Sequence, residues 1–230
     1  MTANIERVGI VGAGHIGQAL ARRAIAAGYE VMISNSRGPD TLRELASGLA
    51  CRTGTVAEAA QFGDLVIVTI PFHAIASLDP SGFAGKVVID TCNHYPGRDG
   101  PDAALDAMDD TSGERLQRRL RDARVVKAFN AIMQGDIERD ARPAGAADRR
   151  ALPIAGDDAD ARRAVAAFVD AIGFDVVDVG PMSECWRFER AMPAYCVPLG
   201  RRALAEALAG AKRNERLPEG SWRSPRALVK

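Results

Sequence analysis

A glycine-rich turn near the amino terminus constrains the fold of this chain more than any other feature. Residues 8–11 form an apolar run typical of a short buried strand, and Gly12, Gly14 and Gly17 follow at G-x-G-x-x-G spacing. In this pattern the first glycine makes a tight turn, the second lets the backbone approach a pyrophosphate, and the third lets the next helix pack against the strand. A helix over about residues 15–27 would point its free N–H groups at negative charge. The context predicts a dinucleotide-binding turn, and the alternative is a turn that serves packing alone.

The end of the second predicted strand indicates which dinucleotide is bound. After residues 30–33 the chain continues Ser34-Asn35-Ser36-Arg37. Proteins that bind NAD usually place Asp or Glu here to hold the ribose 2′-hydroxyl. Hydroxyls, an amide and a guanidinium suit a 2′-phosphate instead, which a carboxylate would repel. The strand end therefore predicts NADP(H), with an ordinary solvated turn as the alternative.

The overall composition argues against several other classes of protein. The chain has 230 residues, 47% of them hydrophobic, which suffices for one sizeable domain and a small appendage. Lys plus Arg and Asp plus Glu both number 30, and this balance disfavours a nucleic-acid or membrane-surface protein. We see neither a membrane-spanning run nor a signal-peptide pattern, so we expect a cytoplasmic protein. The four cysteines lack metal-ligand spacing, so we expect reduced thiols and no metal site.

Strands and helices alternate along the rest of the chain. Further strands are predicted at 49–52, 65–70, 87–90, 124–129, 152–155 and 174–179, with 65–70 central because it is apolar on both faces. Helices are predicted at 41–46 (stopped at Gly48), 55–61, 111–121, 157–172, 183–192 and 203–209. Residues 98–110 and 135–150 are predicted to be loops. This pattern predicts an α/β protein: a doubly wound parallel sheet of the Rossmann NAD(P)-binding fold with a short helical C-terminal extension. We place the NADP-binding domain at residues 1–180 and the extension with its polar tail at 181–230.

The carboxyl ends of the strands should line the ligand crevice in this fold. The loops at 71–73, 91–97 and 130–134 then belong near the nicotinamide. The candidate cofactor-binding residues are Gly12, Ala13, Gly14, His15, Ile16, Gly17, Asn35, Ser36, Arg37, Ile70, Pro71, His73, Asn93, Asn130 and Ile132. His73 and His94 are candidates for contact with a hydride acceptor. No G-x-S-x-G, H-E-x-x-H or S-x-x-K motif stands in a suitable setting, so no catalytic residue is assigned.

Four places in the sequence give the chain a resemblance to a known family. They are Gly-Ala-Gly-His-Ile-Gly at 12–17, Ser-Asn-Ser-Arg at 34–37, Val-Val-Lys-Ala-Phe-Asn-Ala-Ile at 125–132, and Ala-Gly-Asp-Asp-Ala-Asp-Ala-Arg at 155–162 followed by Val-Val-Asp-Val-Gly-Pro-Met-Ser-Glu at 176–184. Over residues 8–195 the chain resembles the F420-dependent NADP oxidoreductase family, whose members transfer a hydride between NADP and the deazaflavin F420. The resemblance implies that the glycine turn and the Ser36–Arg37 pair hold NADP, and that residues 130–133 meet the deazaflavin.

The resemblance leaves the identity of the acceptor open. Typical family members carry His where this chain has Asn130, and Ala-Phe-Asn is more similar to the reductase domain of membrane metalloreductases, which use a flavin. The acceptor is therefore F420 or a flavin such as FMN or FAD. The alternatives are an NADPH-dependent imine or carbonyl reductase of the 6-phosphogluconate dehydrogenase type, for which little chain remains after residue 179, and a non-catalytic NADP-binding sensor.

Two sets of side chains have two interpretations each. Four arginines between residues 139 and 150 could attract the acidic tail of F420 or belong to a solvated loop; they are Arg139, Arg142, Arg149 and Arg150. Apolar residues near the carboxyl end could form a homodimer interface or belong to the core; they are Trp186, Phe188, Met192, Tyr195 and Val197.

Overall fold

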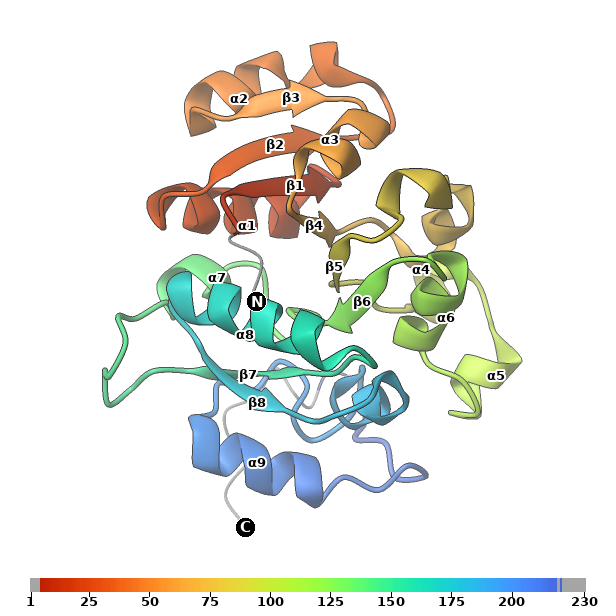
Figure 1. Ribbon diagram of the computed structural model, residues 1–230. Coiled ribbons are helices and arrows are strands. Elements are labelled where there is room, and N and C mark those ends of the chain that lie inside the picture. The colour runs from red at the N-terminus through yellow and green to blue at the C-terminus, as the bar shows by residue number, and fades with distance from the viewer. Residues whose placement is uncertain (1–4, 219, 221–230) are drawn as a thin grey trace.

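A six-stranded parallel sheet forms the centre of the molecule (Figure 1). The computed structural model describes residues 5–218 and 220. The strands are β1 (Arg7–Val11), β2 (Glu30–Ser34), β3 (Arg52–Gly54), β4 (Leu65–Val68), β5 (Val87–Asp90) and β6 (Arg124–Lys127). Their order is β3-β2-β1-β4-β5-β6, so the direction of winding reverses between β1 and β4. The predicted doubly wound parallel sheet with a central fourth strand is confirmed, and a ligand crevice belongs at this reversal point.

Helices cover both faces of the sheet because successive strand residues point to opposite faces and both sets are apolar. On one face, α1 (His15–Ala26) and α8 (Ala159–Ala171) bury Leu20 and Val165 against strand residues such as Ile10 and Ile67. On the other face, α3 (Val56–Phe62) and α6 (Ser112–Arg119) pack with strand residues such as Val66 and Val88.

The approach of α3 to β1 depends on a glycine. A Cβ atom on Gly9 would lie 1.9 Å from the carbonyl oxygen of Ala59, so only glycine fits at this point. The helix, which was predicted at 55–61, begins with a capping box: the Thr55 hydroxyl accepts from the Glu58 N–H at 3.2 Å, and the Glu58 carboxylate accepts from the Thr55 N–H at 2.7 Å. The local capping box thus sets where α3 begins, and the close approach to Gly9 sets where α3 packs on the sheet.

The last two strands form a separate sheet. β7 (Ala151–Ile154) and β8 (Asp175–Asp178) pair in parallel, and α8 connects them. A single antiparallel bridge between Lys127 and Ala155 joins this pair to the end of β6. The predicted strands at 152–155 and 174–179 are present, but they do not extend the main sheet.

Three predicted segments before residue 111 differ from the structure. The helix predicted at 41–46 comprises η1 (Pro39–Leu42) and α2 (Arg43–Leu49), which continues through Gly48 and ends with Ala50 in the left-handed region at φ 53°. The third strand lies at 52–54 rather than 49–52, since α2 occupies the residues before it. The loop predicted at 98–110 contains α4 (Pro96–Asp99) and α5 (Ala103–Asp106).

The segment 135–150 is anchored rather than a free surface loop. It begins with α7 (Asp136–Arg139), which buries Ile137. Arg149 pairs with Asp170 at 2.6 Å and Arg150 with Asp140 at 2.8 Å, and both arginines are at most 5% exposed. The Arg149–Asp170 pair holds this segment against α8, and the Arg150–Asp140 pair lies within the segment. Both arginines are buried and paired, so these two are unsuited to attract an acidic tail from solvent.

The first part of the C-terminal extension is a 3₁₀-helix, η4 (Met182–Phe188), not the α-helix predicted at 183–192. A 3₁₀-helix has three residues per turn, and Met182, Cys185 and Phe188 recur every three residues on one buried face. The last helix, α9 (Arg201–Ala209), ends before Gly210 as predicted. Two further 3₁₀-helices, η2 (Phe72–Ser77) and η3 (Pro80–Phe83), precede β5.

The apolar residues of the extension belong to the core. All five candidates for a dimer interface are at most 8% exposed; they are Trp186, Phe188, Met192, Tyr195 and Val197. This burial confirms the core interpretation for these side chains, and the homodimer stays a prediction. The division into 1–180 and 181–230 also stays a prediction.

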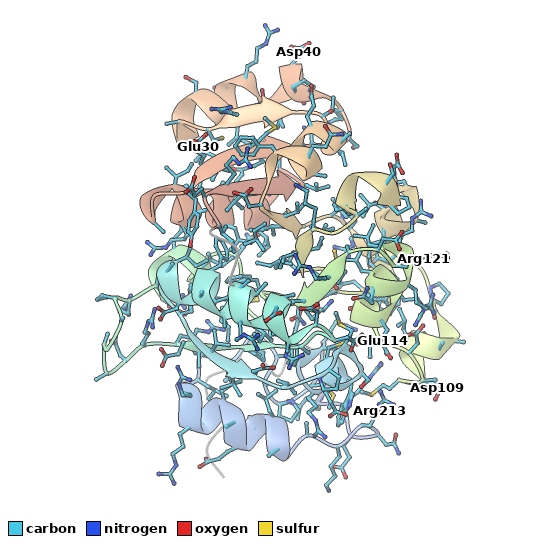
Figure 2. All side chains as sticks on the ribbon, in the orientation of Figure 1. Glu30, Asp40, Asp109, Glu114, Arg121 and Arg213 are labelled. Carbon is cyan, nitrogen blue, oxygen red and sulfur yellow. The ribbon has the colours of Figure 1, made fainter. Side chains whose placement is uncertain are left out.

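Charged side chains lie mostly at the periphery, as Figure 2 shows for Glu30, Asp40 and Asp109. Within residues 5–218 and 220, no helix combines the length and apolar character of a membrane span. The same residues contain no cluster of three or more His, Cys, Asp or Glu side chains arranged for a metal ion. Most of the polar tail of the C-terminal extension lies outside the described residues.

Candidate nucleotide-binding crevice

The three glycines of the first turn have different surroundings. Gly12 has φ 118°, and a Cβ atom there would lie 2.2 Å from the Thr69 carbonyl oxygen. A Cβ atom on Gly17 would lie 2.1 Å from the Gly12 carbonyl oxygen, whereas one on Gly14 would meet no protein atom within 4 Å. Packing therefore requires the outer two glycines. The middle glycine leaves open space at the turn, as a pyrophosphate close to the backbone needs.

The amino end of α1 is suited to an anion. Gly14 is the N-cap residue and supplies no side-chain acceptor to the first N–H groups of the helix. The first turn contains no acidic residue. The exposed N–H groups and the positive end of the helix dipole thus face the space beside Gly14 without a competing negative charge.

The end of β2 carries the residues predicted to select NADP. Ser34 is buried and donates to the Ile10 carbonyl at 3.0 Å, so its hydroxyl serves the sheet. Asn35 shapes the turn, because its Oδ1 accepts from the Arg37 N–H at 2.9 Å. Ser36 and Arg37 are exposed, and among the described residues Arg37 makes no ion pair. Together Ser36 and Arg37 offer a hydroxyl and an uncommitted guanidinium for a phosphate.

A cavity of about 340 Å³ lies at the carboxyl ends of β1, β4, β5 and β6. Eight of the predicted cofactor-binding residues line it: Gly14, His15, Ile16, Ile70, Pro71, Asn93, Asn130 and Ile132. Gly12, Ala13 and Gly17 form the turn behind it, and Asn35, Ser36 and Arg37 lie at the neighbouring end of β2. Ten other lining residues were not among the candidate cofactor-binding residues. Five of them lie in loops predicted to border the crevice, namely Thr91, Cys92, Tyr95, Met133 and Gln134. The other five lie outside those loops, namely Thr69, Arg98, Phe129, Tyr195 and Cys196.

Both predicted histidine contacts lie outside this cavity lining. His73 is half-exposed in η2, and its Nδ1 lies 2.8 Å from the Asp99 carboxylate. His94 Nε2 bonds the Gly100 carbonyl at 2.9 Å, and its ring packs on the edge of Phe72. The prediction placed these residues in strand-end loops, but each loop turns its imidazole toward a neighbouring segment.

Two tyrosines close the cavity on the side of the C-terminal extension. The hydroxyls of Tyr95 and Tyr195 lie 2.6 Å apart, which joins the loop after β5 to a residue 100 positions later. Burial raises the pKa of Tyr195, so this phenol stays protonated. Burial likewise raises the pKa of the Cys92 thiol, which argues against a redox role for that lining cysteine.

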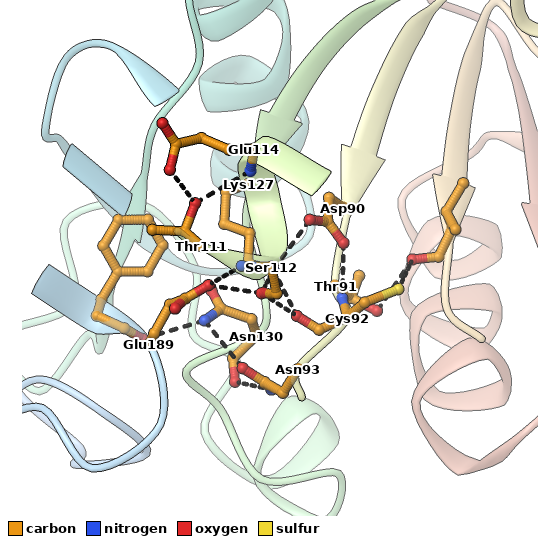
Figure 3. Close-up of polar contacts among 12 residues, drawn as sticks. Asp90, Thr91, Cys92, Asn93, Thr111, Ser112, Glu114, Lys127, Asn130 and Glu189 are labelled. Atoms are coloured by element: carbon orange, nitrogen blue, oxygen red, sulfur yellow. Dashed lines mark hydrogen bonds and ion pairs between the residues drawn. The ribbon is translucent and has the colours of Figure 1, made fainter. Parts of the chain in front are cut away.

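The wall between β5 and β6 is a polar network (Figure 3). Asn93 Nδ2 donates to the Asn130 carbonyl at 2.9 Å, and Asn130 Nδ2 donates to the Phe188 carbonyl at 3.0 Å. Behind these residues, Lys127 Nζ donates to Asp90 Oδ2 at 2.9 Å, and neither side chain has any exposed surface. Sequence reasoning missed this ion pair, although Asp90 ends the predicted strand 87–90, Lys127 lies within the predicted strand 124–129, and the two are register partners.

Lys127 is an ammonium ion. Its burial would lower its pKa, but the charges of Asp90 and Glu189 outweigh that cost, and the pKa is raised. Ser112 Oγ lies 2.8 Å from Lys127 Nζ. A protonated lysine cannot act as a general base, so this pair is unsuited to the serine–lysine type of nucleophilic catalysis.

Comparison with known proteins agrees with this geometry. Residues 7–94 match the model of a family described as NADP oxidoreductase, coenzyme F420-dependent. The chain is 31% identical to a hypothetical protein from Sinorhizobium meliloti of known structure, over 79% of this chain and 87% of that one, with a TM-score of 0.67. A proposed F420-dependent NADP reductase from Arthrobacter sp. FB24 is 25% identical over the same shares of the two chains, also with a TM-score of 0.67.

Another relative is a protein longer than this chain. The metalloreductase STEAP3 of Rattus norvegicus is 29% identical over 210 residues, which cover 84% of this chain. The chain spans 38% of the length of that relative.

The sheet order, the glycine turn and the strand-end cavity define an NADP-binding oxidoreductase of the Rossmann fold. The chain belongs to the F420-dependent NADP oxidoreductase family. This membership supports NADP(H) as its cofactor.

Proposed function

We propose that the protein transfers a hydride between NADPH and a deazaflavin or flavin acceptor. The observation that supports this function best is the cavity that runs from Gly14 to the loops after β4, β5 and β6. It is continuous with the anion-binding end of α1, and it lies where the strand order of the sheet reverses. A cavity in this place can hold the two reacting rings of a hydride transfer beside the dinucleotide phosphates.

The chain's own residues would bind and orient NADPH. The N–H groups at the start of α1 and the space at Gly14 suit the pyrophosphate, and Arg37 with Ser36 suits the 2′-phosphate. Ile70 and Asn93 lie on the nicotinamide side of the reversal point. NADPH, when bound, supplies the hydride, so the protein needs to provide positioning rather than a nucleophile. This fits a cavity without a candidate catalytic triad among its described lining residues.

The remaining part of the cavity suits a flat aromatic acceptor. Ile132 and Met133 follow β6, and Met133 is 39% exposed at the cavity edge. Tyr95 and Tyr195 stand among the other lining residues. Apolar and aromatic side chains of this kind give a ring of the flavin type a surface on which to pack. F420 is supported by the description of the family. A flavin is supported by the resemblance of Ala128-Phe129-Asn130 to the reductase domain of flavin-using metalloreductases.

Stopped-flow absorbance of NADPH oxidation tests the proposal, with F420, FMN and FAD offered separately. Rapid oxidation with F420 alone assigns the deazaflavin reaction despite Asn130. Rapid oxidation with FMN or FAD alone assigns a flavin reductase. If NADPH binds but none of the three is reduced, the proposed acceptor class is wrong. Turnover with a cyclic imine would then support the reductase alternative, and binding without any turnover would support a sensor.

A cytoplasmic location remains part of this proposal, and the fractionation of tagged protein tests it.

A further inference from the structure

Lys127 uses all three of its ammonium protons inside the protein. Nζ donates to Asp90 Oδ2 at 2.9 Å, to Ser112 Oγ at 2.8 Å, and to the Cys92 carbonyl oxygen (Figure 3). Lysine has three donors, so no proton of this ammonium is left over. The Lys127 side chain is 0% exposed, which makes this arrangement a complete buried network around one charge.

The partners of Lys127 form the cavity wall itself. Cys92 lies between Thr91 and Asn93, and all three residues line the cavity. Lys127 holds the Cys92 carbonyl, while the Asp90 carboxylate holds the Cys92 N–H at 2.8 Å. Both backbone groups of the central wall residue are therefore bonded to the two members of one buried ion pair.

The network also ties this wall to the C-terminal extension. Ser112 accepts from Lys127 and donates to the Glu189 carboxylate at 2.6 Å. The Ser112 N–H donates to the same carboxylate at 2.7 Å. Glu189 directly follows Phe188, whose carbonyl accepts from Asn130 at 3.0 Å. One lysine thus connects β5, β6, α6 and the segment that carries Tyr195 into the cavity.

A contribution to the stability of the fold does not by itself explain why a charged lysine is buried at this position. A buried ion pair costs several kcal/mol in desolvation, and well-packed apolar side chains often replace one without loss of stability. A fully satisfied polar network does hold its members in a single geometry. We propose that Lys127 is a positioning residue that fixes the Thr91–Asn93 wall and thereby the nicotinamide end of the bound dinucleotide. The proposal rests on the proposed binding of NADP(H) in this crevice.

The position of the wall in the fold makes the effect selective. The adenosine half of a dinucleotide lies on the β2 side of the reversal point, and the nicotinamide half lies on the side of β4, β5 and β6. Lys127 and its partners stand on the second side only. Loss of the ammonium should therefore weaken NADP⁺ and leave adenosine 2′,5′-bisphosphate, which lacks the nicotinamide half, unaffected.

Calorimetric titration of the full chain with these two ligands tests the inference. Lys127→Met removes the charge and keeps a side chain of similar length. The matched control is Lys86→Met, because Lys86 Nζ also bonds two backbone carbonyls but lies at the opposite end of β5. We expect Lys127→Met to weaken NADP⁺ about tenfold, as for a lost hydrogen bond to a charged group. The affinity of Lys127→Met for adenosine 2′,5′-bisphosphate should equal that of the wild type. Lys86→Met should bind both ligands with wild-type affinity.

A second, smaller substitution tests the inference if Lys127→Met does not fold. Ser112→Ala removes one acceptor and leaves the Lys127–Asp90 pair, and it should show the same selective weakening at reduced size. Equal weakening of both ligands, or of neither, in every variant that folds overturns the positioning role. If the wild-type chain binds neither ligand, the proposed NADP(H) site itself is wrong, which is a different result.

Discussion

Gly14 and Gly17 stand three positions apart in one motif, yet the structure assigns them opposite consequences on substitution. Gly14→Ala places its methyl in open space, and the backbone there, φ −74° and ψ −174°, is accessible to alanine. We expect an unchanged free energy of unfolding and a loss of NADPH affinity, because the methyl fills the space in which we propose that the pyrophosphate binds. Gly17→Ala places its methyl 2.1 Å from a backbone oxygen and should cost about 1–3 kcal/mol of stability, as overpacked sites do. Urea unfolding and NADPH titration of both variants check this separation, and a destabilised Gly14→Ala would contradict it.

Arg37 is expected to determine the preference for NADPH over NADH. Its exposed guanidinium is free of ion pairs within the described part of the chain, so its substitution by alanine should leave the fold intact. We expect Arg37→Ala to raise the KM for NADPH about tenfold, because a hydrogen bond to a charged phosphate is lost, and to leave the KM for NADH nearly unchanged. Steady-state kinetics with both nucleotides measure this selectivity. Arg43→Ala is the control, since that arginine pairs with Asp40 instead.

At the scale of the elements, a single carboxylate holds α4 to η2. The side chain of Asp99 has no exposed surface and accepts from the Arg98 guanidinium at 2.8 Å, from the Tyr95 N–H at 2.9 Å, and from the His73 N–H at 3.3 Å. Burial by itself would raise the pKa of Asp99, but these hydrogen bonds outweigh it and hold the pKa well below its usual range. The Tyr95 loop that lines the cavity therefore depends on this charge.

The lowered pKa of Asp99 sets a direction for the pH dependence of stability. The folded protein binds the proton more weakly than the unfolded chain, so the contribution is complete above the unfolded pKa of about 3.9 and is lost as the pH falls below it. We expect Asp99→Asn to be less stable than the wild type by about 1–2 kcal/mol at neutral pH. The difference should shrink toward pH 3. Urea unfolding at several pH values measures it, and a constant difference would show that the charge is not the cause.

At the scale of the whole molecule, the C-terminal extension shares one hydrophobic core with the sheet. Phe188 is fully buried in the same cluster as Val11 and Val68, and the Leu204 side chain of α9 completes that cluster. We expect Phe188→Ala to destabilise the entire protein by about 3–5 kcal/mol, as large-to-small substitutions of buried aromatics do.

The shared core also predicts a single cooperative transition. Hydrogen exchange should report the same opening free energy for amides in β1 and for those in η4, and Phe188→Ala should lower both together. Exchange of η4 at a distinctly lower free energy would show that the extension unfolds separately, as the predicted division at residue 180 would allow.

The elements governed by near neighbours were predictable from the sequence. The glycine turn, the capping box of Thr55 and Glu58, and the cap that Asp158 gives α8 each depend on residues within a few positions of one another. The apolar run at 65–70 predicted a central strand for the same reason, since burial on both faces leaves a continuous local pattern. The doubly wound sheet and eight of the cavity-lining residues followed from these local signals.

Contacts between distant parts of the chain could be known only from the tertiary structure. The Tyr95–Tyr195 hydrogen bond joins residues 100 positions apart, and the Lys127–Asp90 pair joins residues 37 positions apart. The buried Arg149 pairs with Asp170 of α8, 21 positions later, and the imidazoles of His73 and His94 bond Asp99 and Gly100 instead of lining the cavity. Local patterns record which face of an element is apolar, but the partner of a buried charge is set by the register of the strands and the packing of the extension. For that reason the sequence determined the fold and the glycine turn of the candidate site, and the tertiary structure determined the cavity wall formed by Thr91, Cys92 and Asn93.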